Sequence, residues 1–451
     1  MVETVSFYPT KKLFIDVLTR DISIRDCTFD LLDNAADSYI RHGISDTRQV
    51  QVSFDDDHFE IKDYCGGIGK KQLLEEVFRF GLIDLNVQAK TIGVYGIGLK
   101  RSIFKIGRNI LLETDDGNDY CSLKIDVDEW MKDEENWDLP LTDTSSSRLN
   151  GNKPYSYINI KNLRDESKDL FATPFFESSL KENASIYYSS FINAKEIEFI
   201  INGDKLPGYE ITIRATDDYK PVKYEETYDG IDIKIICWID VSDIEEKRKR
   251  LERVDTGWNV YMNKRLVMLG DTSASTGWIG QRAYLPQYHP IYNQFRGIVF
   301  LSTNEPYKLP VNTSKNNFNT ESRIYQHLLT RMCEVARPLV DYLSDKYERS
   351  KRRIDNTEAT AVKDIQEDTD EQKNKNPKIS TLQEAEYVSK FIPPKIEEKP
   401  RVIETSIQYS KPKKRVELVK QILGVKRNWE AGAETFEYFW DAEGLDDIKQ
   451  T

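Results

Sequence analysis

Three short clusters of acidic, amide and glycine residues between positions 30 and 100 limit what this chain can fold into. The first, DLLDNAADSYI, lies in a predicted amphipathic helix over residues 24–41, whose apolar residues recur at helical spacing: Cys27, Leu31, Leu32, Ala35 and Tyr39. Asp30, Asn34 and Asp37 stand at i, i+4 and i+7 and share the opposite face. Two acids and an amide on one face suit a hydrated cation and an oriented water. A solvated helix face is the alternative interpretation.

The second cluster, DYCGGIGK, directly follows a strand pattern. Gly66, Gly67 and Gly69 let the backbone pass close to a ligand, because a residue without a Cβ adopts turns that other residues avoid. Asp63 places a carboxylate at the end of the strand. A simple glycine-rich turn is the alternative.

The third cluster, TIGVYGIGLKR, places Gly93, Gly96 and Gly98 before a predicted helix that begins near Leu99. Free N–H groups at a helix N-terminus bind anions, and Lys100 adds a positive charge. The order of the glycines matches neither the dinucleotide fingerprint nor the P-loop. The cluster therefore predicts a phosphate site of another kind.

The surrounding pattern predicts antiparallel strands. QVQVSF and HFEIKD alternate around an Asp-rich turn, NILLET and DYCSLKID repeat this arrangement, and YSYINIKNL supplies a further strand. Helices packed on one such sheet give an α/β sandwich in the α+β class.

In this order the clusters resemble the motifs of the GHKL ATPases (gyrase, heat-shock chaperone, histidine kinase, MutL), which have the Bergerat fold. Asp30-x-x-x-Asn34 is similar to the N box, and Gly93-x-x-Gly96-x-Gly98-Leu99-Lys100 to the second glycine box. Asp63-x-Cys65-x-Gly67 is similar to the D-x-G-x-G box, with Cys65 at its first glycine. Tyr155-Ser156 stands where the family has Gly-Thr, and Ser156 keeps the hydroxyl.

The resemblance implies that ATP and Mg²⁺ bind here. Asp63 would accept a hydrogen bond from the adenine amine, Asn34 would ligate Mg²⁺, and Asp30 would orient or deprotonate the attacking water. Residues 70–95 would form a lid over the nucleotide. The other nucleotide contacts implied are Asp37, Gly67, Gly69, Gly93, Tyr95, Gly96, Ile97, Gly98, Leu99, Lys100 and Ser156.

Asp30 departs from the family, which usually has glutamate at this position. Aspartate is shorter by one methylene, ~1.5 Å of reach. We therefore expect slow hydrolysis rather than none.

A second unit is predicted from a helical stretch followed by several strands and a last helix over residues 321–347. GWNVYMNKRLVML, FRGIVFLS and LPVNTSKNNF resemble the S5-like transducer domain of MORC and MutL proteins. The resemblance implies that Lys315 reaches the γ-phosphate and acts in catalysis. A surface lysine in a polar loop is the alternative.

The expected organisation follows from these resemblances and from a change in composition. It comprises a GHKL ATPase domain (1–165), an S5-like α/β transducer domain (166–347), a charged linker whose apolar residues are candidates for docking (348–410), and a short helical C-terminal element (411–451). The first dozen residues would cross to a partner as a strap.

Composition narrows the class of protein further. Lys and Arg number 64 against 76 Asp and Glu, and the net charge of −12 argues against a uniformly basic nucleic-acid coat. The five cysteines are scattered without a C-x-x-C pair, so neither a disulfide framework nor a structural zinc site is expected. Without an apolar leader or a long apolar run, the chain is expected to be cytoplasmic and not bound to a membrane.

Taken together, the sequence resembles a prokaryotic MORC-like ATPase that closes as a homodimer on binding ATP. DNA is one candidate target of such a clamp, in restriction or anti-phage defence, and a partner protein docked on the C-terminal helices is another. The alternatives are a chaperone-like ATPase of the heat-shock type and a GHKL protein kinase. The kinase is disfavoured because none of the four histidines precedes the ATPase domain in a dimerisation helix.

Overall fold

The computed structural model describes residues 10–80, 89–93, 96–241, 256–312, 315–353, 378–394 and 410–443. The chain divides into two compact units. Residues 1–352 and 356–398 form the first, and residues 353–355 and 399–451 form the second. Parts of two expected segments lie outside the described residues. These are residues 81–88 and 94–95 of the expected lid, which include Tyr95, and residues 1–9 of the expected strap.

The first unit begins with a sheet that has eight strands in its described part, in the order β5-β4-β3-β6-β2-β1-β7-β8. Neighbouring strands are antiparallel except for β1 and β7, so the predicted α+β fold with a mixed, mostly antiparallel sheet is confirmed. The strands are β1 (Arg48–Phe54), β2 (His58–Asp63), β3 (Gly107–Asp115), β4 (Asp119–Asp126), β5 (Leu141–Ser146), β6 (Tyr155–Leu163), β7 (Ile197–Ile201) and β8 (Asp204–Lys205).

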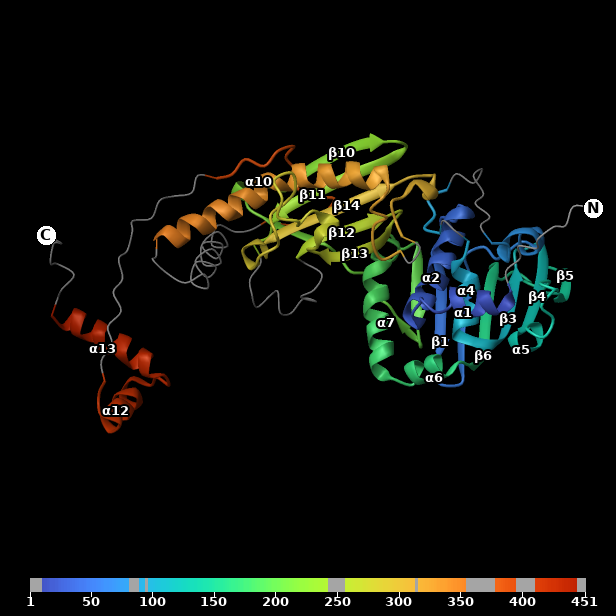
Figure 1. Ribbon diagram of the computed structural model, residues 1–451, viewed down its shortest axis with the longest axis horizontal. Helices are drawn as coiled ribbons and strands as arrows, with labels where there is room; N and C mark the ends of the chain where they lie inside the picture. The colour runs from blue at the N-terminus through green and yellow to red at the C-terminus, as the bar shows by residue number, and fades with distance from the viewer. Residues whose placement is uncertain are drawn as a thin grey trace, which may run out of the picture. The chain divides into compact units, whose positions relative to one another are not determined.

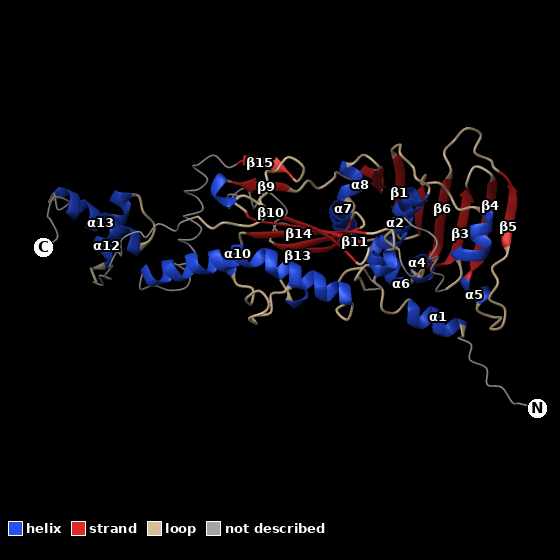
Figure 2. Ribbon diagram, turned by 90° about the horizontal axis from the view of Figure 1, so that it is seen from above, coloured by secondary structure: helices blue, strands red, loops and turns tan. Residues whose placement is uncertain are grey.

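Helices α1 (Lys11–Leu18), α2 (Ile24–Arg41) and α4 (Gly98–Ile106) lie against one face of this sheet (Figures 1 and 2). Helix α2 forms as predicted, and Ser23 caps it by accepting a hydrogen bond from the Asp26 N–H. The shorter elements are α3 (Lys70–Gln72), a π-helical turn (Leu73–Val77) and α5 (Val127–Trp130).

The core of this sheet continues past residue 165, where the domain boundary was expected. After α6 (Asp165–Phe171), α7 (Pro174–Tyr187) and α8 (Ser189–Asn193), strand β7 pairs in parallel with β1, with Phe199 opposite Val50. The same hydrophobic core extends as far as Leu206. The alternation of polar and apolar residues predicted β7 but not the sheet that it joins, because the same pattern suits either sheet.

A second sheet has five strands in the described residues, in the order β10-β11-β14-β12-β13. Helix α10 (Arg323–Arg353) packs along one face and runs six residues beyond the predicted end at 347 (Figure 2). The strands are β10 (Val222–Tyr228), β11 (Ile231–Ile239), β12 (Gly257–Met262), β13 (Arg265–Asp271) and β14 (Phe295–Ser302). Four 3₁₀ turns cover Asp217–Tyr219, Ala274–Thr276, Pro290–Tyr292 and Pro306–Lys308.

Part of the expected charged linker is packed structure. Strand β15 (Lys378–Thr381) pairs with β9 (Thr212–Ala215), and Phe391 is buried in the core beneath α10. A few apolar residues are enough to pack residues 378–394 against the second sheet, although the composition of the whole segment is that of a linker. The rest of the expected linker up to residue 409, apart from the end of α10, lies outside the described residues.

The second compact unit contains two helices, α12 (Lys413–Leu423) and α13 (Asn428–Ala442), which contact each other. Gly424 ends α12 in the left-handed conformation that favours glycine. Within the described part of the chain no helix has both the length and the apolar character needed to cross a bilayer.

We predict that Phe391→Ala lowers the free energy of unfolding of the full chain by about 3 kcal/mol, because it removes a large buried ring. Ile392→Ala is the matched control, since Ile392 is 80% exposed and should change stability by less than about 0.5 kcal/mol. Urea unfolding of both variants measures the difference. Equal effects would show that residues 378–394 do not pack against the second sheet.

Candidate functional site

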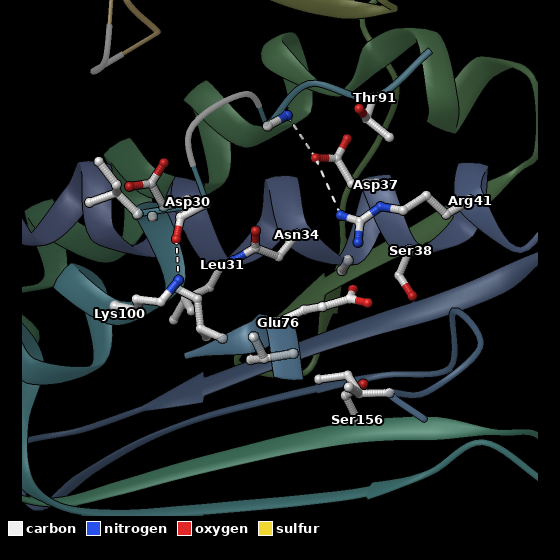
Figure 3. Close-up of a pocket in the computed structure, with 18 of the residues that line it drawn as sticks. Asp30, Leu31, Asn34, Asp37, Ser38, Arg41, Glu76, Thr91, Lys100 and Ser156 are labelled. Carbon is white, nitrogen blue, oxygen red and sulfur yellow. Dashed lines mark hydrogen bonds and ion pairs between the residues drawn. The ribbon is translucent and has the colours of Figure 1, made fainter. Parts of the chain in front are cut away.

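One cavity of about 700 Å³ is lined by residues of all three sequence clusters and by Lys315. Figure 3 shows Asp30, Lys100 and Ser156 around this space. Helix α2 forms one wall, β2 and β6 line the sheet side, and the loop after β14 contributes Lys315. Every predicted site residue lines the cavity except Gly69, which is described but not part of the lining, and Tyr95, which is not described.

The polar side chains of α2 are not a solvated helix face. Asp30 and Asp37 are almost completely buried, and Asn34 lines the cavity between them (Figure 3). Buried carboxylates require compensation by cations or N–H groups. Asp37 is compensated mainly by backbone N–H groups, whereas Asp30 is compensated by cationic side chains.

Asp37 of α2 forms hydrogen bonds to the backbone of the glycine-rich segment. Its carboxylate accepts hydrogen bonds from the backbone N–H groups of Ile92 at 2.5 Å and Gly93 at 2.7 Å, with Arg41 3.9 Å away. A Cβ on Gly93 would lie 2.8 Å from the Asp37 carboxylate, so a larger residue there would have to displace that carboxylate. Burial raises the pKa of Asp37, while Arg41 acts to lower it. The structure thus places Asp37 against the protein backbone, beside the space for a ligand.

Asp63 and Ser156 lie opposite each other where β2 pairs with β6. The Asp63 carboxylate accepts a hydrogen bond from the Cys65 N–H at 2.9 Å. Burial raises the pKa of Asp63 to about 6, although the hydrogen bonds from Cys65 and Ser156 act to lower it. An acid at the cavity wall with few donors of its own can accept another from a ligand.

The turn after β2 requires glycine at Gly67. This residue has a φ of +70°, and a Cβ there would lie 2.5 Å from the carbonyl oxygen of Asp115. The glycine therefore lets the backbone that lines the cavity pack directly on the end of β3.

The third cluster ends at the start of α4, whose first residue is Gly98. A Cβ on Gly98 would lie 3.0 Å from the Asp30 carboxyl carbon, so glycine brings the helix N-terminus close to that acid. The Lys100 ammonium donates to the carbonyl of Gly96 and lies 5.2 Å from the centre of the Phe80 ring. Burial lowers the pKa of Lys100 to about 8.

Arg101, the partner of Asp30, was not among the residues predicted from the sequence. Arg101 donates from Nε at 2.9 Å and from Nη2 at 2.7 Å, both to Asp30 Oδ2. Lys315 Nζ approaches the other oxygen, Oδ1, at 3.3 Å. Asp30 is therefore a buried carboxylate held by two cations. Arg101 is the last residue of the TIGVYGIGLKR cluster, and this position was the sequence signal for it.

Asp33 and Arg265 were also missed. Lys315 Nζ donates to Asp33 Oδ2 at 2.8 Å, and Arg265 Nε donates to Asp33 Oδ1 at 2.7 Å. Asp33 stands three residues after Asp30, and Arg265 belongs to the YMNKRLV stretch already singled out. Only the approach of the second sheet to α2 brings the two together.

Asp33 and Lys315 each favour the charged form of the other. Burial acts to raise the pKa of Asp33, but Arg265 and Lys315 outweigh it and lower the pKa. Burial likewise acts to lower the pKa of Lys315, but Asp33 and Asp30 outweigh it and raise the pKa. Lys315 is therefore a partly buried ammonium that lines the cavity, with its side chain only 12% exposed, and not a surface lysine.

We predict that Asp63→Asn stabilises the protein at neutral pH. A carboxyl whose folded-state pKa is raised contributes stability below its unfolded value, and this contribution is lost as pH rises through the folded value. The variant should match the wild type near pH 4 and exceed it in free energy of unfolding by roughly 1–3 kcal/mol above pH 7. Denaturant unfolding across this range measures the difference. A constant difference at all pH values would contradict the raised pKa of Asp63.

Comparison with known proteins gives one family. Residues 22–158 match the family model of the histidine kinase-, DNA gyrase B- and HSP90-like ATPases. No curated protein matches the chain. The matched range contains α2, both glycine-rich segments and Ser156, but ends before Lys315. The family match therefore supports placing the first domain in the GHKL superfamily, whose members in general bind and hydrolyse ATP.

Proposed function

We propose that the protein binds ATP with Mg²⁺ in this cavity and hydrolyses it slowly. The observation that carries the proposal is the meeting of α2, the end of β2, the glycine-rich segment and Lys315 around one space. In the proposed complex, adenine lies against Asp63 and Ser156. The phosphates lie between the start of α4 and Lys315, where N–H groups and two ammonium groups attract negative charge.

The residues present fit a magnesium ion bound together with a nucleotide. The Nδ2 atom of Asn34 is buried and makes no hydrogen bond to the described residues, so the amide can turn its oxygen to a cation. Among the described residues no three acidic, histidine or cysteine side chains converge on one point. This suits Mg²⁺, which keeps several waters and takes its other ligands from phosphates. The ion would neutralise phosphate charge.

Asp30 is the proposed general base. Arg101 occupies one of its oxygens with two N–H groups and so orients the carboxylate. The other oxygen meets Lys315 only at 3.3 Å and remains the acceptor for a water. The aspartate is one methylene shorter than the glutamate usual in the family, and this shorter reach supports slow turnover.

The second sheet is proposed to act as an S5-like transducer of the MORC-like or MutL-like type. Lys315, which the loop after β14 delivers to Asp30, supports this role because its position depends on how the two sheets meet. Closure on ATP would join two copies as a clamp. The proposed target is DNA, in restriction or anti-phage defence, although the net charge of −12 confines contact with DNA to local positive surface.

We expect Asp30→Asn to retain nucleotide binding and to lose hydrolysis by at least about 100-fold, because the general base is removed. Calorimetric titration with a non-hydrolysable ATP analogue measures binding, and phosphate release measures turnover. Asp21→Asn is the control, since Asp21 is an exposed acid just before α2. Turnover at the wild-type rate in Asp30→Asn would exclude Asp30 as the base, and failure of the wild type to bind would exclude the proposed function.

We also expect the chain to change from monomer to dimer when the non-hydrolysable analogue is added with Mg²⁺. Light scattering after size-exclusion chromatography measures the mass. The same experiment with linear and with closed circular DNA tests the clamp, since a closed dimer slides off free ends. Retention on closed circles alone supports a topological clamp, whereas equal retention on both forms indicates ordinary DNA binding, and no retention excludes DNA as the target.

A further inference from the structure

Three successive residues of the second sheet attach to the first domain. The turn between β12 and β13 contains Asn263 and Lys264, and Arg265 is the first residue of β13. Each of the three is bonded to a different segment of the first domain. Asn263 donates to the Thr91 carbonyl at 2.7 Å, and Lys264 pairs with Glu196 at 2.6 Å. Arg265 pairs with Asp33 at 2.7 Å. Among these three contacts only the last lies inside the buried ion cluster that also holds Lys315.

Asp33 is bonded to side chains from three parts of the fold. Its Oδ1 accepts from Arg265 and from the Tyr188 hydroxyl at 2.7 Å, and its Oδ2 accepts from the Lys315 ammonium. The side chain of Asp33 is only 1% exposed, so water does not compete for these bonds. Buried bonds between charged groups fix geometry more firmly than exposed ones.

Arg265 also holds the backbone of Lys315. Its Nη1 donates to the Lys315 carbonyl at 3.3 Å, and the Lys315 N–H donates to the Asn312 carbonyl at 3.0 Å. The main chain of Lys315 is therefore tied to Arg265, while its ammonium is tied to Asp33. Both ends of the lysine depend on the same carboxylate.

An ammonium has three N–H donors. In Lys315 one points to Asp33 at 2.8 Å and a second makes the longer contact with Asp30 at 3.3 Å. The third donor has no partner among the described residues and is open to a ligand in the cavity that Lys315 lines. The stronger bond can persist while the weaker one gives way to an anion.

We propose that Asp33 is the positioning residue of the site: it anchors the Lys315 ammonium and so makes the affinity for ATP depend on the γ-phosphate. Asp33 does not itself line the cavity and acts through Lys315. The inference rests on the proposed function, because it concerns how the nucleotide is recognised. ADP lacks the γ-phosphate, so its binding should not depend on Asp33.

The test compares affinities for ADP and for a non-hydrolysable ATP analogue, by calorimetry on the full chain with Mg²⁺. In Asp33→Asn we expect affinity for the ATP analogue to fall about 10-fold, as for the loss of one hydrogen bond between charged groups, with ADP changed less than about 2-fold. Lys264→Met is the matched control and should change neither affinity. Lys264 is the neighbouring residue, and its ion pair with Glu196 lies at the surface.

A double-mutant cycle separates positioning from a general structural effect. If Asp33 acts through Lys315, then Asp33→Asn added to Lys315→Met should leave the ratio of the two affinities unchanged. A further fall in that ratio in the Lys315→Met background would overturn the proposal. So would an unchanged ratio in folded Asp33→Asn.

Removing a buried charge can prevent folding, because Arg265 would lose its partner. In that event Tyr188→Phe provides the test, since it removes one donor to Asp33 and leaves every charge in place. A smaller fall of about 3-fold in affinity for the ATP analogue alone supports the proposal, and no change overturns it. A wild type that binds neither nucleotide refutes the proposed function itself, whereas a wild type that binds both with no effect of these variants refutes only the role of Asp33.

Discussion

The arrangement of the site depends on a buried ion cluster along helix α2. Two carboxylates, Asp30 and Asp33, are held by Arg101 from α4, by Arg265 from β13 and by Lys315 from the loop after β14. Each ion would be costly to bury alone, and breaking one such pair typically costs 3–5 kcal/mol. The cluster therefore forms only when α2, α4 and the second sheet meet correctly. The positions of the charged side chains in the cavity therefore depend on how the two sheets pack against each other.

The ionisable side chains at the cavity are of two kinds: some are stabilised in the charged form by an ion pair, and one is destabilised in that form by burial. Asp33 and Lys315 are paired, so their pKa values move away from neutrality and both stay charged. Asp63 has no cation as a partner among the groups that shift its pKa, and burial raises that pKa to about 6. Such a group reduces stability at neutral pH and is compensated only when a ligand donates to it. An acid in this state is consistent with recognition of an adenine amine.

The sequence predicted local features well. The periodicity of apolar residues predicted α2, and the alternation of polar and apolar residues predicted β1 and β2. The glycines of DYCGGIGK predicted a turn after β2, and Gly67 adopts the positive φ of such a turn. Long-range features were predicted poorly. The alternation in β7 did not show that it pairs with β1 across the expected boundary, and the charged composition around Phe391 hid a buried ring.

By itself the sequence determined which polar residues and glycines share one helix face or one turn, because spacing along a helix or a turn is set locally. It placed Asp30 and Asn34 on one face of α2 and the glycines at the start of α4. Only the tertiary structure decided which cations pair with the carboxylates of α2. Asp33 and Arg265 are 232 positions apart, and no local pattern links them. Their pairing depends on the docking of a second sheet onto α2, because burial removes water and leaves each charge to find its partner in the protein.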